Sequence, residues 1–285
     1  MPMETITEND SEQELASAGF YWRECEGVLA LVCRALEQDG FTNAFSTRLG
    51  GTSLMPDGAL NLAGFVDDAP ENIFENRRRF LKLFNGEWTL ATSWQTHGAE
   101  TRVVSSEREA RSDEERCDAQ ITSTPGILLG AKTADCVPVL LGDRRTGACA
   151  AIHGGWRGTS LSIVPRALER MQREFGTQVA DVRAAIGPSA RVCCYEVGSE
   201  VIEIFRERFK DGGELFVSTR GGHARIDLQR ANFNQLVQAG VSPERIHIAA
   251  LCTMDRNELF FSYRREKFQR GRVGRLLAVI GRTTR

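Results

Sequence analysis

The sequence lacks an excess of charge of either sign and any long apolar run. Its 285 residues carry 36 Lys and Arg against 38 Asp and Glu, a formal net charge of -2. This balance provides no long-range field to steer the chain onto nucleic acid or an anionic membrane. Every apolar run is shorter than the roughly 20 residues that a membrane-spanning helix needs. We therefore expect neither nucleic acid nor a membrane as a partner.

Histidine is scarce, and cysteine is too sparse to form a disulfide framework. The chain has 4 His and 8 Cys, whereas disulfide-stabilised scaffolds are small and rich in cysteine. Its first residues are acidic and polar, unlike a signal peptide, so we expect a cytoplasmic protein with reduced thiols. Neither CxxC nor HExxH occurs, so spacing alone is weak evidence for a metal site.

Apolar runs typical of strands alternate with helical patterns along most of the chain. Residues 1–19 show no sustained apolar period and are predicted to be a disordered tail, while residues 20–285 form one domain. The polar stretch 142–147 separates two apolar runs and predicts a hairpin turn. Mixed strand pairing with scattered helices indicates an α+β fold with mixed β-sheets flanked by helices.

The expected elements follow from these periodicities. Asp68 and Glu71 resemble a capping box at a helix start, and Pro165 requires the helix around it to begin late or to kink. The strands are expected at 27–32, 44–46, 127–132, 137–141, 148–153, 182–186, 246–251, 259–263 and 276–280, and the helices at 72–84, 160–175, 199–210 and 228–239.

Two histidines and one cysteine lie where functional sites are usually built. His97 and His153 each occupy a point where an extended segment gives way to glycine, and Cys136 follows Asp135 at the start of an apolar run. Each residue also has a structural alternative. The histidines can be structural residues whose hydrogen bonds are made at a strand end, and Cys136 can be a small buried side chain. The adjacent pair Cys193 and Cys194 is predicted to stay reduced, because a disulfide between neighbours is strained.

Several short motifs occur in a fixed order along the chain. They are FSTRLGG at 45–51, LNL at 60–62, QTHG at 95–98, TADCVPVLL at 133–141, HGGWRG at 153–158, IGP at 186–188, CCYEVG at 193–198 and FSYRR at 261–265. These motifs resemble those of the YfiH family, whose members carry the historical label of multicopper polyphenol oxidoreductase or laccase-domain proteins. Thr96, Gly154 and the stretch 189–192 depart from the usual family pattern, but no departure removes a candidate ligand.

The resemblance implies one metal ion held by His97, Cys136 and His153, with zinc favoured and copper as the alternative. It also implies phosphorolysis of adenosine, inosine or methylthioadenosine, deamination of adenosine, and phenol oxidation. Three protein ligands leave one tetrahedral position open, as in catalytic zinc sites. One copper alone cannot carry out four-electron oxygen reduction, so we rank purine nucleoside chemistry above polyphenol oxidation.

Other roles follow from residue type. Arg48, in a glycine-flanked loop, is the preferred phosphate ligand, and Arg157 and Arg264 are further candidates. Asp135 is either a catalytic base or structural. A purine base needs a stacking surface, for which Phe45, Trp156 and Tyr195 are the candidates. The alternatives are a copper-dependent polyphenol oxidase, a metal-free Cys136/His hydrolase, and a non-catalytic binding module with a structural metal.

Overall fold

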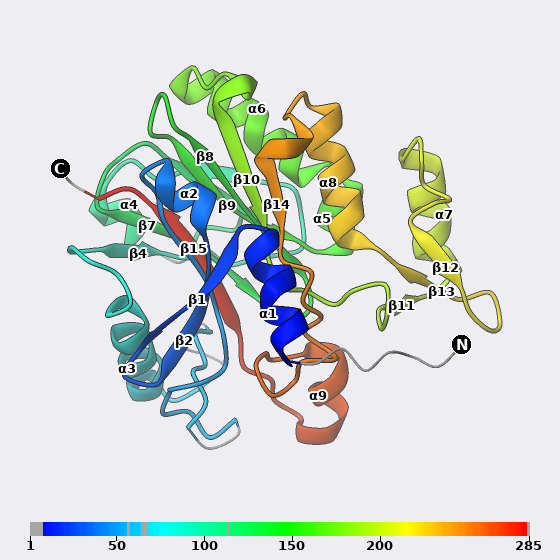
Figure 1. The fold of residues 1–285 in the computed structure, drawn as a ribbon, viewed down its shortest axis with the longest axis horizontal. Coiled ribbons are helices and arrows are strands. Elements are labelled where there is room, and N and C mark those ends of the chain that lie inside the picture. The colour runs from blue at the N-terminus through cyan, green and yellow to red at the C-terminus, as the bar shows by residue number, and fades with distance from the viewer. Residues whose placement is uncertain (1–7, 56–57, 64–67, 113, 284–285) are drawn as a thin grey trace.

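Two six-stranded sheets form the centre of the molecule (Figure 1). The computed structural model describes residues 8–55, 58–63, 68–112 and 114–283. The first sheet has the order β1-β2-β3-β15-β7-β4, with β1 Phe20–Cys25, β2 Val28–Cys33, β3 Thr42–Ser46, β15 Leu276–Gly281, β7 Ile127–Thr133 and β4 Thr89–Ala91. The second has the order β14-β10-β8-β9-β6-β5, with β14 Ile246–Ile248, β10 Val182–Ile186, β8 Val137–Asp143, β9 Cys149–Gly154, β6 Ala119–Thr122 and β5 Thr101–Val103.

A small third sheet and the helices complete the fold. The third sheet has the order β11-β13-β12, and with α7 it stands at one side of the molecule, on the right in Figure 1. Its strands are β11 Glu196–Val197, β13 Ala224–Ile226 and β12 Phe216–Ser218. The helices are α1 Glu8–Ser17, α2 Arg34–Gln38, α3 Pro70–Leu81, α4 Glu107–Ala110, α5 Trp156–Ser160, α6 Ile163–Phe175, α7 Ser199–Arg208, α8 Leu228–Gln238 and α9 Tyr263–Arg270, with 3-10 turns η1 Val179–Asp181 and η2 Pro243–Arg245.

Strand alternation divides the buried side chains among three apolar clusters. Successive strand residues point to opposite faces, so Leu129 and Leu140 meet between the two large sheets. Leu128 packs on the other face of the first sheet with Phe80 of α3. Leu141 packs on the outer face of the second sheet with the buried stripes of α6 and α8. The molecule is therefore layered as helix, sheet, sheet and helix.

The expected α+β fold with mixed sheets is confirmed. The strands β4 and β7, β5 and β6, and β10 and β14 pair in parallel, and the remaining pairs are antiparallel. The predicted hairpin at 142–147 joins β8 to β9, with Asp143 Oδ2 accepting a 2.6 Å hydrogen bond from Thr146 Oγ1 in the turn. This hairpin brings the start of β8 beside the end of β9, which positions the candidate site.

The strand predicted over 259–263 is wrong. Residues 259–262 are irregular and α9 begins at Tyr263. Ser262 Oγ accepts a hydrogen bond from the Arg265 N–H (3.2 Å), and Glu266 Oε2 accepts one from the Ser262 N–H (3.2 Å). This reciprocal cap fixes the helix start. The apolar run arises because Phe260 and Phe261 are fully buried.

Other boundaries also differ from the sequence prediction. The prediction of a disordered tail over 1–19 is contradicted at residues 8–17, which form α1. Leu15 of this helix packs in the core between the sheets. Residues 1–7 lie outside the described residues. The helix predicted over 160–175 is split into α5 and α6, and Pro165 falls in the first turn of α6, where a missing N–H leaves no helix bond unmade. Asp68 does not cap α3, since the N-cap is Ala69.

Candidate metal centre and substrate pocket

Three chain segments bring His97, Cys136 and His153 together. Cys136 immediately precedes β8 and His153 lies near the end of β9. In the antiparallel pairing, Val137 lies opposite Gly154 and Pro138 opposite His153. This register places the thiol beside the imidazole across the strand pair. His97 comes from the loop between β4 and β5.

The three side chains form a group that fits a metal ion. Their ligand atoms all lie within 4.8 Å of one another, and the two imidazole rings meet edge to face with centroids 4.9 Å apart. Ligands of a tetrahedral zinc ion with bonds of about 2.0–2.3 Å lie roughly 3.3–3.6 Å apart. Gly155 leaves the space open, because a Cβ there would lie 3.1 Å from His97 Cδ2 and 3.2 Å from Cys136 Sγ.

Asp118 is the functional residue that sequence reasoning missed. It is 2 % exposed and directly precedes β6, which pairs with β9. Its Oδ1 lies 2.8 Å from His153 Nδ1 and accepts from the His97 N–H (2.9 Å). Its Oδ2 accepts from the N–H groups of Gly98 (2.8 Å) and Thr96 (3.1 Å). One carboxylate thus orients both histidines, as partners of metal-binding imidazoles typically do.

The charges of these groups reinforce one another. Burial alone would raise the pKa of Asp118, but the hydrogen bond and charge of His153 and the surrounding N–H groups lower it. Burial would also raise the pKa of the Cys136 thiol, yet the charges and hydrogen bonds of His153 and His97 lower it to about 6. The pKa of His153 is raised to about 9 against burial, by Cys136 and Asp118. The thiol is therefore held in its thiolate, metal-binding form.

The backbone at the first ligand is strained. His97 has φ +61°, in the left-handed region that a residue other than glycine rarely occupies. In this conformation the N–H groups of residues 96, 97 and 98 all donate to the carboxylate of Asp118. These charge-assisted bonds hold the loop in its unfavourable conformation.

The carboxylate of Asp135 points into the protein framework. Oδ1 accepts from Thr253 Oγ1 (2.7 Å), and Oδ2 accepts from Ser262 Oγ (3.0 Å) and from the Arg264 N–H (2.7 Å). Its pKa is raised by burial despite these bonds. The side chain joins the Cys136 segment to the start of α9. This contact supports a structural role for Asp135 over the role of catalytic base.

The buried contacts of Arg48 count against the phosphate-binding role predicted for it. Its guanidinium is 6 % exposed and lies 4.5 Å from the ring centroid of Phe261. Nη1 donates to Glu266 Oε1 (2.9 Å) and to the carbonyl of Asn257 (2.9 Å), and Nη2 donates to the carbonyl of Met55 (3.0 Å). Both terminal nitrogens are committed to buried acceptors, so Arg48 holds the α9 region in place.

A pocket of about 280 Å³ is lined by two aromatic residues that lie near the metal group, although the three ligands are not part of its lining. Trp156 lines it directly after Gly155, and Tyr195 forms another wall. Burial, followed by the charge of Cys136, raises the pKa of Tyr195 to about 12, which reflects its closeness to the thiol. Arg264 lies over the Tyr195 ring at 5.2 Å. The full lining is Trp156, Tyr195, Glu196, Val197, Gly198, Glu200, Val201, His223 and Arg264.

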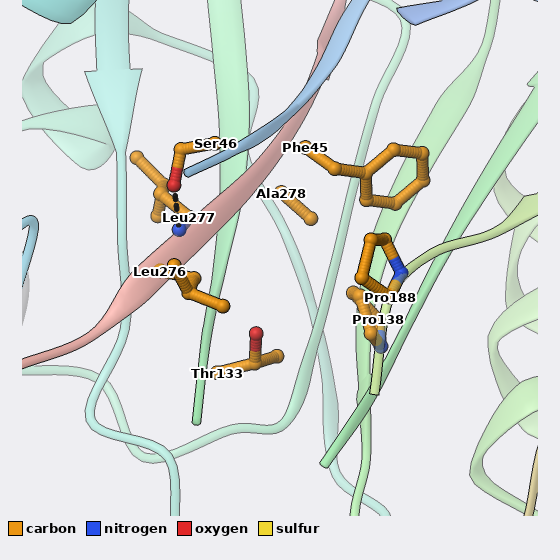
Figure 2. Close-up of a pocket in the computed structure, with 8 residues that line it drawn as sticks. All are labelled: Phe45, Ser46, Thr133, Pro138, Pro188, Leu276, Leu277 and Ala278. Atoms are coloured by element: carbon orange, nitrogen blue, oxygen red, sulfur yellow. Dashed lines mark hydrogen bonds between the residues drawn. The ribbon is translucent and has the colours of Figure 1, made fainter. Parts of the chain in front are cut away.

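The remaining candidates divide between the surface and the core. Arg157 is exposed and stacks on Trp156, with Cζ 4.4 Å from the ring centroid. Phe45 is 2 % exposed and lines a separate cavity of about 10 Å³ between β3, β8 and β15, shown in Figure 2. That cavity has room for about one water molecule, so Phe45 packs in the core and is not available to stack on a purine.

The chain is similar to several known proteins. Residues 42–283 match the family model described as multi-copper polyphenol oxidoreductase laccase. A purine nucleoside phosphorylase of Bacteroides thetaiotaomicron is 36 % identical over 80 % of this chain and 87 % of its own. Adenosine deaminase RL5, from an unknown prokaryote, is 33 % identical over 88 % and 94 %.

A solved structure has the same fold. The crystal structure of the hypothetical protein YfiH from Bacillus licheniformis superposes with a TM-score of 0.84 at 29 % identity, covering 92 % of this chain and 99 % of the other. Among the described residues, no helix combines the length and apolar character needed to span a membrane.

Proposed function

Because this chain belongs to the multi-copper polyphenol oxidoreductase laccase family, we propose that it is a zinc-dependent purine nucleoside phosphorylase. Its substrates are adenosine, inosine and methylthioadenosine together with phosphate, and it also deaminates adenosine. The observation that carries the proposal is the three-ligand group His97, Cys136 and His153, with two aromatic residues of the pocket wall, Trp156 and Tyr195, close to it. The names of the phosphorylase and deaminase relatives support the substrate class.

The ligand set determines what a bound metal would supply. Zinc held by three protein ligands keeps a position open for a reactant and acts there as a Lewis acid. Cys136 binds as thiolate, and His97 and His153 bind as neutral imidazoles. Asp118 keeps the His153 ring oriented through its Nδ1 contact, which leaves Nε2 as the atom that would bind the ion.

The pocket walls match the parts of a nucleoside. The faces of Trp156 and Tyr195 can stack on a purine base. Arg264 and the exposed Arg157 supply guanidinium groups for phosphate, and we prefer them to Arg48 because Arg48 pairs with the buried Glu266. Glu200, also in the lining, can accept hydrogen bonds from ribose hydroxyls. In phosphorolysis the bond from C1′ to the base breaks as C1′ bonds to a phosphate oxygen.

A nucleoside panel tests the proposal. Wild type, Cys136→Ala and the matched control Cys25→Ala are incubated with each nucleoside, with and without phosphate, and products are read by mass spectrometry. Cys25 is a free thiol on β1 and does not belong to the group of three ligands. We expect the sugar 1-phosphate only with phosphate, as ribose-1-phosphate from adenosine and inosine and as methylthioribose-1-phosphate from methylthioadenosine. We also expect inosine from adenosine without phosphate, and loss of all these products in Cys136→Ala alone.

Other outcomes identify the alternatives. Oxygen uptake with a phenol by copper-loaded protein, without nucleoside turnover, would favour polyphenol oxidase. Turnover that survives chelation but not thiol alkylation would favour a metal-free Cys136/His hydrolase. No product from any nucleoside, with a chelation-dependent melting temperature, would favour a binding module whose metal is structural.

A further inference from the structure

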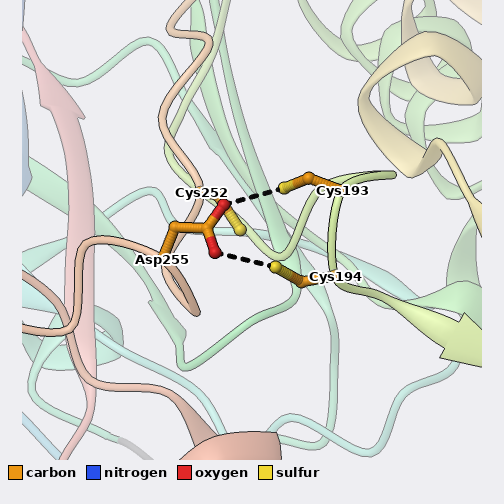
Figure 3. Close-up of side chains that lie close together, drawn as sticks. All are labelled: Cys193, Cys194, Cys252 and Asp255. Atoms are coloured by element: carbon orange, nitrogen blue, oxygen red, sulfur yellow. Dashed lines mark hydrogen bonds between the residues drawn. The ribbon is translucent and has the colours of Figure 1, made fainter. Parts of the chain in front are cut away.

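A second group of metal-ligating side chains lies outside the site already described. Cys193, Cys194, Cys252 and Asp255 place three thiols and a carboxylate with their ligand atoms within 4.8 Å of one another (Figure 3). Cys193 Sγ is 3.1 Å from Asp255 Oδ2, and Cys194 Sγ is 2.9 Å from Oδ1. All three cysteines are free.

The backbone makes two neighbouring thiols point the same way. In an extended strand, adjacent side chains point to opposite faces. Here the chain turns, because the N–H groups of Cys194 (2.9 Å) and Tyr195 (2.8 Å) both donate to the carbonyl of Arg191. The turn therefore lets Cys193 and Cys194 reach the same carboxylate.

The second half of the group comes from a loop at about 250–257, and Asp255 is 62 positions from Cys193 and 61 from Cys194. The Thr253 N–H donates to the carbonyl of Ser189 (3.0 Å), beside a bridge between Ser189 and Cys252. The Arg256 N–H donates to the carbonyl of Cys252 (2.9 Å), closing the turn that carries Asp255. Backbone contacts thus hold the two loops in register, so the donor set is preformed.

The donor chemistry selects a soft or borderline cation. Three thiolates and one carboxylate give zinc its four tetrahedral ligands and leave no open position, which is the arrangement of structural sites. Hard cations such as Mg²⁺ prefer oxygen ligands. The S–H groups of free thiols form only weak hydrogen bonds, so the contacts to Asp255 alone are a poor reason for gathering three of them.

The surroundings offset the charge of such a complex. Zinc with three thiolates and one carboxylate has a net charge of 2 − 4 = −2. Three guanidinium groups hold the same loops: Arg191 donates to the carbonyl of Ala250 (2.8 Å), Arg225 to that of Cys193 (2.8 Å) and Arg265 to that of Met254 (3.0 Å).

We propose that Cys193, Cys194, Cys252 and Asp255 bind a second, structural zinc ion that joins the loops around residues 189–195 and 250–257. The two joined loops each contact the surroundings of the first metal site. Tyr195, next to Cys194, is a wall of the pocket. Thr253, next to Cys252, donates to Asp135, the neighbour of Cys136. This inference is independent of the proposed function.

Metal content of the full-length protein tests the proposal. Protein is reconstituted with zinc, freed of excess metal and measured by mass spectrometry of the metal. We expect two zinc ions per chain in wild type and in the control Cys25→Ser, and one each in Cys136→Ala and Cys194→Ser. One ion in wild type, unchanged in Cys194→Ser, would overturn the proposal whether or not nucleosides are turned over.

A second measurement keeps the test valid if Cys194→Ser fails to fold. In the Cys136→Ala background, cobalt substitution reports only the second group, so a thiolate-to-cobalt absorption band is expected that weakens in Cys136→Ala with Asp255→Ala. A folded protein without this band would contradict the proposal. So would a disulfide among Cys193, Cys194 and Cys252 in purified protein, detected by alkylation under denaturing conditions without reductant.

Discussion

Replacing Asp118 with asparagine removes the charge that orients both histidines. The carboxylate oxygens of Asp118 accept from at least two donors each: His153 and the His97 N–H on Oδ1, and the N–H groups of Gly98 and Thr96 on Oδ2. Asparagine offers one oxygen, so its NH2 group faces at least two donors in either orientation. At about 1.5–3 kcal/mol for each charge-assisted bond, the loss is about 3–6 kcal/mol in the free energy of unfolding.

The same change weakens the metal site. Loss of a carboxylate that orients a metal-binding histidine lowers metal affinity by about 10–100-fold. Urea unfolding of the chelated protein gives the first quantity, and zinc titration against a competing chelator gives the second. Asp181→Asn is the matched control, because Asp181 pairs with Arg145 at the surface and its loss changes stability by about 1 kcal/mol or less. Wild-type zinc affinity and stability in Asp118→Asn would refute the reasoning.

Three further predictions follow from the site. Arg48→Met leaves Glu266 buried without its ion-pair partner and should lower the free energy of unfolding by about 3–5 kcal/mol. The KM for phosphate should stay unchanged. A raised KM in stably folded protein would instead support phosphate binding by Arg48. Gly155→Ala should weaken zinc binding about tenfold in the chelator titration, whereas Gly213→Ala, where a Cβ meets nothing within 4 Å, should not. Zinc affinity should rise from pH 6 to 9, because the proton on His153, whose pKa is raised to about 9, must leave before metal binds; a flat or falling profile would contradict this.

The sequence predicted the family, the hairpin and the group of three ligands because each has a local signature. Each of the motifs around His97, Cys136 and His153 is an uninterrupted stretch of sequence. The β8–β9 hairpin is predicted by the polar turn between two apolar runs. Family membership is confirmed by the match over residues 42–283. The metal and the catalytic roles of these residues stay predictions.

The residues that the sequence misjudged depend on distant partners. Asp118 is a single aspartate before a short strand, and only the pairing of β6 with β9 puts it beside His153. Arg48 looks like an anion ligand until Glu266, 218 positions away, is seen beside it. No local pattern records such contacts, since they arise from the packing of the sheets against the α9 region.

The left-handed backbone at His97 has a consequence for how this protein responds to selection. A non-glycine residue in that conformation costs roughly 1–3 kcal/mol, so a library screened only for heat resistance should enrich glycine or asparagine at position 97. Such variants would melt later and hold metal poorly. A screen that selects for thermal tolerance in the absence of zinc would therefore select against metal binding at this site. Substitutions at position 97 would be the first change expected in the selected variants.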